Sequence, residues 1–245
     1  MSLLLNKSVI VTGAGRGIGS SIARLFAANG AKVVVHFNNS AEAAARLAAE
    51  IAGTAIQADL RKQEHVERLV QEALAAVGNI DILVNNAASF SHAASSDDET
   101  WDDYTEEWNG VFGTTYRVIT QVAPVMKEQG GGRIINFGAT LIQRPASGYG
   151  AHTCAKAAVL ALTRNLAKEL GPFRINVNAV SPGMTLTEFT NSLSPADREK
   201  VSAITPLRRL ATPDDVANVC LFLASDMAAF VTGANISPDG GLAQL

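Results

Sequence analysis

Cysteine is scarce in this sequence, and neither sign of charge dominates. Cys154 and Cys220 are the only two cysteines in 245 residues, too few for the disulfide framework of a small secreted domain. We therefore expect a reducing, cytoplasmic environment. The chain carries 20 Lys and Arg against 23 Asp and Glu, a net charge of -3, so it has no basic excess with which to bind nucleic acid.

Long apolar runs are also missing. The chain begins MSLLLNKS, in which three leucines are followed by no small-residue cleavage pattern, and no later run is long enough to cross a bilayer. We expect neither secretion nor insertion into a membrane. With 47% hydrophobic and 18% charged residues, the chain can bury one large core, and we expect residues 1–245 to form a single domain.

Strand and helix patterns alternate nearly to the end of the chain. Short runs rich in β-branched residues are typical of buried strands, and the segments between them repeat apolar residues at helical spacing. This alternation predicts an α/β protein with a doubly wound parallel sheet of the Rossmann type and a three-layer α/β/α arrangement. The expected strands cover residues 9–11, 32–36, 54–57, 81–84, 133–137, 175–180 and 230–237. The expected helices cover residues 20–29, 41–51, 64–77, 111–127, 151–170 and 213–224.

The first expected strand leads directly into a glycine-rich turn, residues 12–19, which read TGAGRGIG. Its glycines allow a sharp turn and a close approach of the backbone to a pyrophosphate, and the helix that follows adds partial positive charge at its N-terminus. The strand before, the helix after and the position near the start of the chain agree. The turn therefore predicts a dinucleotide-binding site.

The second expected strand ends without an acidic residue. Residues 36–40 read HFNNS, whereas a carboxylate at this place would bind the ribose 2'-hydroxyl of NAD and repel a 2'-phosphate. Arg16, inside the glycine-rich turn, is suited to pair with a phosphate. We therefore expect NADP(H) to be favoured over NAD(H).

Residues 89–107 interrupt the alternation and are strongly acidic. We expect a solvated surface loop that leads into the start of a helix. If this segment lies near the mouth of the site, it would repel an acidic carrier protein. Its acidic residues, with no Lys or Arg between them, are Asp97, Asp98, Glu99, Asp102, Asp103, Glu106 and Glu107.

Taken together, these motifs make the chain resemble the short-chain dehydrogenase/reductase family over essentially its whole length. Residues 12–19 are similar to the family's TGxxxGxG motif, Asp59-Leu60 to its adenine-side contact, and residues 85–88, NNAA, to its NNAG motif with the last Gly replaced. Residues 181–183, which read SPG, together with Thr187 and the tail from Thr205 to Gly241, look like the 3-oxoacyl-(acyl carrier protein) reductase branch.

The resemblance implies a nicotinamide cofactor, and we expect no metal centre. It also implies a homodimer or homotetramer in which the helices at 111–127 and 151–170 pack against partner subunits. The residues expected to bind the cofactor are Gly13, Ala14, Gly15, Arg16, Ile18, Gly19, Asn38, Asp59, Leu60, Asn86, Lys156, Thr185 and Thr187.

The family's catalytic pattern is only partly present. In the family, a Tyr precedes a Lys by four residues, a Ser lies thirteen residues before that Tyr, and an Asn lies further upstream. Lys156 matches the Lys, but the Tyr position reads His152 and the Ser position reads Ala139. When the chain is lined up on Gly113, the position of the family's Asn falls on Gly110, and Asn109 lies one residue away.

Addition of hydride to a carbonyl places negative charge on its oxygen, which then needs a proton donor and a second hydrogen-bond donor. Ala139 can donate nothing. His152 could give a proton, although a neighbouring Lys156 ammonium disfavours the charged imidazole. Tyr149 is an alternative acid if the helix extends back to it.

Two nearby side chains are weaker alternatives. Thr140 carries a hydroxyl beside Ala139, but adjacent residues of a strand face opposite ways. We expect Cys154 to be a small buried residue rather than a nucleophile.

The expected function is an NADP(H)-dependent oxidoreductase that reduces a carbonyl or oxidises an alcohol of a small molecule, with an atypical catalytic centre. Apolar side chains of Met184, Leu186, Phe189 and Leu193 would line part of its substrate pocket. The alternative is a nucleotide-binding protein without redox turnover, acting as a sensor or as one subunit of a mixed assembly. A third possibility is non-redox chemistry with His152 as a base.

Overall fold

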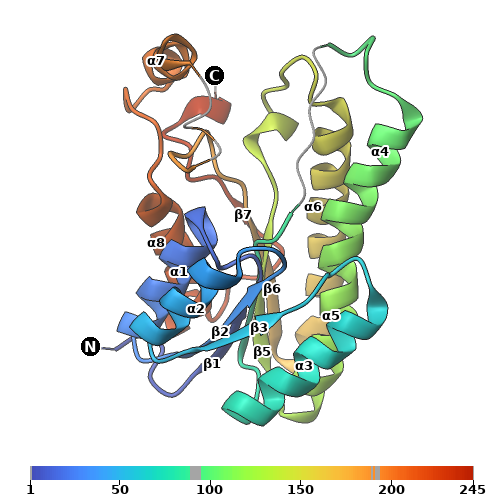
Figure 1. Ribbon diagram of the computed structural model, residues 1–245, viewed down its shortest axis with the longest axis vertical. Helices are drawn as coiled ribbons and strands as arrows, with labels where there is room; N and C mark the ends of the chain where they lie inside the picture. Colours follow the sequence, from blue (N-terminus) through green and yellow to red (C-terminus); the bar gives the residue numbers. More distant parts are fainter. Residues whose placement is uncertain (1, 89–94, 189, 191–193, 245) are drawn as a thin grey trace.

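The computed structural model describes residues 2–88, 95–188, 190 and 194–244. A seven-stranded sheet runs in the order β3-β2-β1-β4-β5-β6-β7, and every neighbouring pair of strands is parallel. Helices α1, α2 and α8 cover one face, and α3, α5 and α6 cover the other (Figure 1). The doubly wound, three-layer fold expected from the alternating pattern is confirmed.

Most of the expected elements begin and end within three residues of the expected bounds. Among the described residues, no helix is long and apolar enough to cross a membrane. The strands are β1 (Ser8–Val11), β2 (Lys32–Phe37), β3 (Thr54–Gln57), β4 (Ile82–Asn85), β5 (Gly132–Phe137), β6 (Ile175–Val180) and β7 (Asn235–Ile236). The helices are α1 (Gly17–Ala28), α2 (Ala41–Glu50), α3 (Gln63–Val77), α4 (Trp101–Glu107), α5 (Thr114–Glu128), α6 (Gly150–Leu170), α7 (Pro195–Ile204) and α8 (Pro213–Ala224), with a π-helical segment η1 (Trp108–Gly113) between α4 and α5.

Side chains that alternate along each central strand fill two separate cores. In β1, Val9 and Val11 pack on the side of α1 and α8, together with Phe26 and Cys220. Ile10 points the other way and joins the core under α3 and α5. Because a strand covered on both faces buries every side chain, these strands appear in the sequence as continuous apolar runs.

The strand expected over residues 230–237 is much shorter than predicted. Only Asn235 and Ile236 pair with β6, and Phe230 is fully exposed. The Asn178 amide donates to the Val231 carbonyl oxygen at 2.8 Å and its Oδ1 accepts from the Ala234 N–H at 3.1 Å. Side-chain hydrogen bonds therefore satisfy backbone groups that a longer strand would have paired in the sheet.

The acidic segment contains the expected start of a helix, and it corrects the expectation for one residue. A helix, α4, begins there behind Thr100, whose side chain accepts from the Asp103 N–H while the Asp103 carboxylate accepts from the Thr100 N–H. Such a capping box starts a helix. Asp97, Asp98, Asp102 and Glu106 face solvent as expected, but Glu107 is fully buried.

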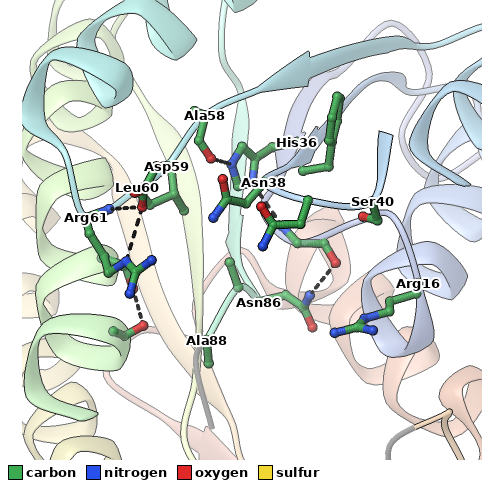
Figure 2. A pocket seen from close by; sticks show the side chains of 16 residues that line it. Arg16, His36, Asn38, Ser40, Ala58, Asp59, Leu60, Arg61, Asn86 and Ala88 are labelled. Carbon is green, nitrogen blue, oxygen red and sulfur yellow. Dashed lines mark hydrogen bonds and ion pairs between the residues drawn. The ribbon is translucent and has the colours of Figure 1, made fainter. Parts of the chain in front are cut away.

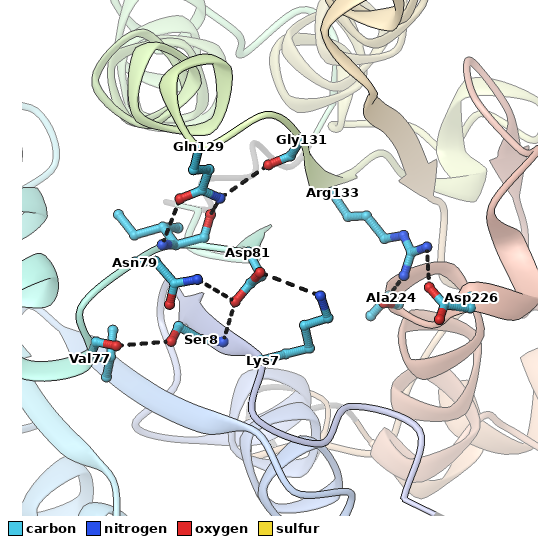
Figure 3. Close-up of polar contacts among 11 residues, drawn as sticks. Lys7, Ser8, Val77, Asn79, Asp81, Gln129, Gly131, Arg133, Ala224 and Asp226 are labelled. Atoms are coloured by element: carbon cyan, nitrogen blue, oxygen red, sulfur yellow. Dashed lines mark hydrogen bonds and ion pairs between the residues drawn. The ribbon is translucent and has the colours of Figure 1, made fainter.

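The amino ends of the strands are closed by their own polar side chains (Figure 3). The Asp81 carboxylate accepts from the Ser8 N–H at 2.8 Å and the Asn79 amide at 3.1 Å, and lies 3.5 Å from the Lys7 ammonium. Near by, Arg133 is paired with Asp226 at 2.9 Å. These groups bind each other, so this edge of the sheet is structural.

Candidate active site

A cavity of about 530 Å³ opens at the carboxyl ends of β1, β2, β3 and β4 (Figure 2). The strand order reverses between β1 and β4, and ligands of open α/β sheets bind at such a reversal. The cavity therefore lies where the fold places a ligand. Its lining includes Gly13, Arg16, Asn38, Asp59, Leu60 and Asn86, all expected at the cofactor site, and also Ser40, Arg61, Ala87, Ala88, Gly110 and Thr114.

The glycine-rich turn at residues 12–19 is packed too tightly for side chains. Gly13 has φ +64°, and a Cβ there would lie 2.9 Å from the Cα of Ala87. A Cβ at Gly19 would lie 2.4 Å from the Gly13 carbonyl oxygen. Ala14 and Gly15 are buried in the same turn, and Ile18 packs against the core behind it. The glycines thus place the backbone itself at the wall of the cavity.

Asn86 and Thr12 hold this turn in place. The Asn86 amide donates to the carbonyl oxygens of Thr12 at 2.9 Å and Gly13 at 3.1 Å, and Figure 2 shows its side chain beside the turn. The Thr12 hydroxyl oxygen accepts from the Ala87 N–H at 3.0 Å. Asn86 lines the cavity and also fixes the turn to β4.

His36, at the end of β2, is a second support that the sequence analysis missed. Its Nδ1 accepts from the Gly13 N–H at 3.0 Å, and its Nε2 lies 3.0 Å from the carbonyl oxygen of Ala58. A carbonyl only accepts, so Nε2 carries the proton and the ring is neutral. Burial lowers the pKa of His36 to about 4, against the opposing effect of its bond to Ala58. His36 therefore joins the first three strands at their carboxyl ends.

Two arginines line the cavity. Figure 2 shows the Arg16 and Arg61 side chains on opposite sides of the cavity, with Asn38 between them. The Asp59 carboxylate accepts from the Arg61 N–H at 3.1 Å and its Nε at 3.3 Å. Burial favours the neutral acid, but these Arg61 contacts outweigh it and lower the pKa of Asp59. Arg61 was not singled out from the sequence, although it directly follows the Asp59-Leu60 pair.

The segment after β6 reaches back to the start of α1. A Cβ placed on Gly17 would lie 3.4 Å from the Thr187 side chain, so this residue lies over the glycine-rich turn. Thr185 is buried, and its hydroxyl donates to the Gly183 carbonyl oxygen at 3.0 Å. Met184 is half-buried and Leu186 is exposed, while Phe189 and Leu193 lie outside the described residues.

A buried cluster of ionisable groups lies between α4 and α6. The Lys156 ammonium donates to the carbonyl oxygen of Phe137, the last residue of β5, at 2.9 Å. Burial lowers the pKa of Lys156 to about 8, and the negative charge of Glu107 opposes this lowering. His152 lies one turn before Lys156 on α6, and both are buried.

Glu107 completes this buried cluster. Its Oε2 lies 2.7 Å from Nδ1 of His152, and Glu107 has 0% of its surface exposed. The expectation that Glu107 belongs to a solvated acidic run is therefore wrong. The run ends at this residue because the last turn of α4 packs against α6, and its inner face becomes core.

The comparisons with known proteins agree with this geometry. The family model described as Enoyl-(Acyl carrier protein) reductase matches residues 13–243. The chain belongs to the short-chain dehydrogenase/reductase family. It is 35% identical over 247 residues to the 3-oxoacyl-(acyl-carrier-protein) reductase FabG of Staphylococcus epidermidis, covering 97% of this chain and 99% of that protein. The FabG of Chlamydia trachomatis is 36% identical over 250 residues, covering 98% and 99%.

A solved structure is also similar. It is described as a 7 alpha-hydroxysteroid dehydrogenase complexed with NADH and 7-oxo glycochenodeoxycholic acid. It matches with a TM-score of 0.92 and 34% sequence identity, over 97% of this chain and 94% of that chain. Short-chain dehydrogenases/reductases of this similarity share the fold throughout, so the residues of the site can be compared by their place in it.

Several side chains weighed as alternatives for this short-chain dehydrogenase/reductase lie in other environments. The Thr140 hydroxyl donates to the Pro182 carbonyl oxygen at 3.1 Å. Tyr149 stands at the cap position just before α6, because the helix begins at Gly150. Cys154 is exposed, so the expectation of a buried residue is wrong. Asn109 is exposed within η1, whereas Gly110 lines the cavity.

Proposed function

We propose that this protein is an NADP(H)-dependent oxidoreductase that interconverts a carbonyl and an alcohol on a small molecule, with an atypical catalytic centre. The observation that carries the proposal is the position of His152 and Lys156, one helical turn apart and both buried on α6. The names of the relatives, reductases and a dehydrogenase, support the same reaction class.

The residues of the cavity fit a dinucleotide. Backbone amides of the glycine-rich turn and the N-terminus of α1 suit a pyrophosphate, and Asp59 and Leu60 stand where an adenine would be bound. Thr185, Thr187 and Lys156 are the residues that we propose to contact the nicotinamide half. When bound, the cofactor supplies or accepts the hydride.

The preference for NADP(H) rests on the chain's own residues. No carboxylate ends β2, since Asn38 stands there and its Oδ1 accepts from the Gln57 amide at 3.3 Å. Arg16 and Ser40 line the same part of the cavity, and a guanidinium beside a hydroxyl favours an added phosphate. The structural neighbour is described with NADH, so the fold alone does not set this preference.

The proton chemistry follows from the substitutions. Ala139 and Gly110 stand where the family's Ser and Asn are expected, and neither side chain has a hydrogen-bond donor. His152 then serves as the proton-exchanging group, with Lys156 beside it. Tyr149 is the second choice because α6 begins at Gly150, so Tyr149 precedes the helix that carries the other two.

Surface features support the proposed partners. The exposed Trp108 and Tyr116 rings flank Phe112, with centroids 4.4 Å and 6.0 Å from it. This aromatic face of η1 and α5 suits an interface with a second copy of the chain, in a homodimer or homotetramer.

The exposed acidic residues of α4 disfavour an acidic carrier protein, so we propose a free small-molecule substrate. Two unpaired cysteines fit a cytoplasmic protein.

The test is NADPH oxidation with a panel of small ketones, and NADP reduction with the matching alcohols. Turnover should fall about 10²-fold or more in His152→Phe, while the Kd for NADPH stays within about twofold, since His152 acts on the substrate. Lys156→Met should weaken both turnover and NADPH binding. Tight NADPH binding without turnover of any substrate would instead favour the nucleotide-binding alternative.

A further inference from the structure

The pairing of Glu107 with His152 joins two elements that are distant in the sequence. Glu107 ends α4, and His152 lies in the first turns of α6, 45 residues later. A buried carboxylate without a partner is strongly destabilising, since it loses its hydration and gains nothing in return. The chain nevertheless places Glu107 where it is fully buried and 2.7 Å from the imidazole.

The bond determines which ring nitrogen carries a proton. An ionised carboxylate only accepts hydrogen bonds, so Nδ1 of His152 must be the donor. Nε2 is then the nitrogen that can exchange a proton with a substrate. A carboxylate behind a histidine acts in this way in other proton-transfer sites, where it holds the ring in one tautomer and one orientation.

The charges of the buried cluster favour the same arrangement. Lys156 and Glu107 interact electrostatically, so the carboxylate offsets the positive charge of the ammonium that lies one helical turn from the imidazole. Gly110, on the inner face of the next turn, has no side chain to contribute. Glu107 therefore supplies the acidic side chain that α4 and η1 present to His152.

We propose that Glu107 is the positioning residue of this site, holding His152 with Nδ1 toward its carboxylate and Nε2 toward the reacting oxygen. The inference rests on the proposed function. In carbonyl reduction, a hydride from NADPH forms the new C–H bond, the Nε2 proton passes to the oxygen, and imidazolium becomes neutral imidazole. In alcohol oxidation, neutral Nε2 takes the hydroxyl proton and the hydride passes to NADP.

Two measurements test the proposal in the full-length protein. The first is nitrogen-15 NMR of labelled histidine, with the His152 signals assigned by their loss in His152→Phe. The second is steady-state kinetics with the ketones of the panel. The variants are Glu107→Gln, which keeps the shape, Glu107→Asp, which keeps the charge, and Glu107→Leu, with the exposed neighbour Glu106→Gln as the matched control.

We expect a protonated Nδ1 in the wild type and in Glu106→Gln, and an altered Nδ1 signal in Glu107→Gln and Glu107→Leu. In these two variants kcat should fall about 10²- to 10⁴-fold, while KM and the Kd for NADPH change less than about twofold. Glu107→Asp should recover part of kcat. In a His152→Phe background, Glu107→Gln should cause no further loss of kcat.

The possible results separate this inference from the proposed function. An unchanged Nδ1 signal in Glu107→Leu, or a kcat within about twofold of wild type, would overturn the role of Glu107. If Glu107→Leu does not fold, Glu107→Gln decides the same question. If the wild type turns over no substrate, the proposed function fails, and the NMR signals still show whether Glu107 sets the tautomer of His152.

Discussion

The cavity and the buried cluster lie on one edge of the same sheet, yet they are made of different groups. The cavity wall is largely main chain, held by Asn86 and His36 through hydrogen bonds to the glycine-rich turn. The buried cluster consists of the ionisable side chains Glu107, His152 and Lys156. A site built from backbone keeps its chemistry when neighbouring side chains change, whereas one built from side chains changes with each substitution. In the catalytic assignment that we propose, the family's pattern is accordingly kept in the first region and altered in the second.

The largest expected effect comes from rebuilding the second region toward the family pattern. From the sequence alone, Ala139→Ser with His152→Tyr should restore two donors to the carbonyl oxygen. The structure adds Glu107, whose buried charge next to a phenol would disfavour the phenolate and would itself lose its partner. We therefore expect the triple variant with Glu107→Leu to exceed the double variant in ketone reduction by about 10²-fold or more.

The measurement is kcat for NADPH-dependent ketone reduction in the single, double and triple variants. The donors act on the same oxygen, so their effects should be strongly non-additive. If the double variant already equals the triple one, then Glu107 does not influence position 152. If the wild type already has a high kcat and none of the substitutions changes it, then the proton comes from another group, with Tyr149 first among the candidates.

In the first region, the largest expected effect is a loss of stability as the pH is lowered. The pKa of His36 is lowered from 6.5 to about 4 by burial, so between these values the unfolded chain binds more protons than the folded one. Stability therefore falls as pH drops through this window, by up to about 3 kcal/mol from His36. Urea unfolding of wild type and His36→Gln from pH 7 to pH 4 should show curves that converge toward low pH. Curves that stay parallel would mean that His36 does not remain neutral in the fold.

Much of this molecule could be predicted from its sequence, for reasons that differ between the two regions. Short runs of β-branched residues predicted the strands, and apolar residues at helical spacing predicted the helices. The bounds of β3, β6 and α8 are as expected, because the local sequence pattern determines such elements. The glycine-rich turn was found because its chemistry is contiguous. The burial of Glu107 was missed because six other acidic residues precede it in the same segment, and only packing on α6 distinguishes Glu107 from them. His36 was missed because its partners, Gly13 and Ala58, come from two other strand ends.

A smaller effect is expected at Arg16. Arg16→Ala should weaken NADPH binding by roughly 1.5–3 kcal/mol, the value of one charge-assisted contact, and leave NADH binding nearly unchanged. Fluorescence titration with each cofactor measures both affinities. Arg24→Ala is the matched control, since Arg24 lies on α1, the helix that follows Arg16, and pairs with Glu50 away from the cavity. Equal or reversed affinities of the wild type for the two cofactors would contradict the assignment of NADP(H).

The smallest effect is expected at the opposite edge of the sheet, where Asp81 joins Lys7, Ser8 and Asn79 (Figure 3). Asp81→Asn keeps an acceptor for the Ser8 N–H but removes the charge that faces Lys7, whose side chain is 45% exposed. Because exposed ion pairs contribute little, unfolding free energy should fall by about 1 kcal/mol or less. Urea midpoints measure this loss, and the Kd for NADPH should stay within about twofold of wild type. A larger change in NADPH binding would show that the glycine-rich turn depends on the amino ends of β1 and β4, and that Asn86 and His36 alone do not hold it.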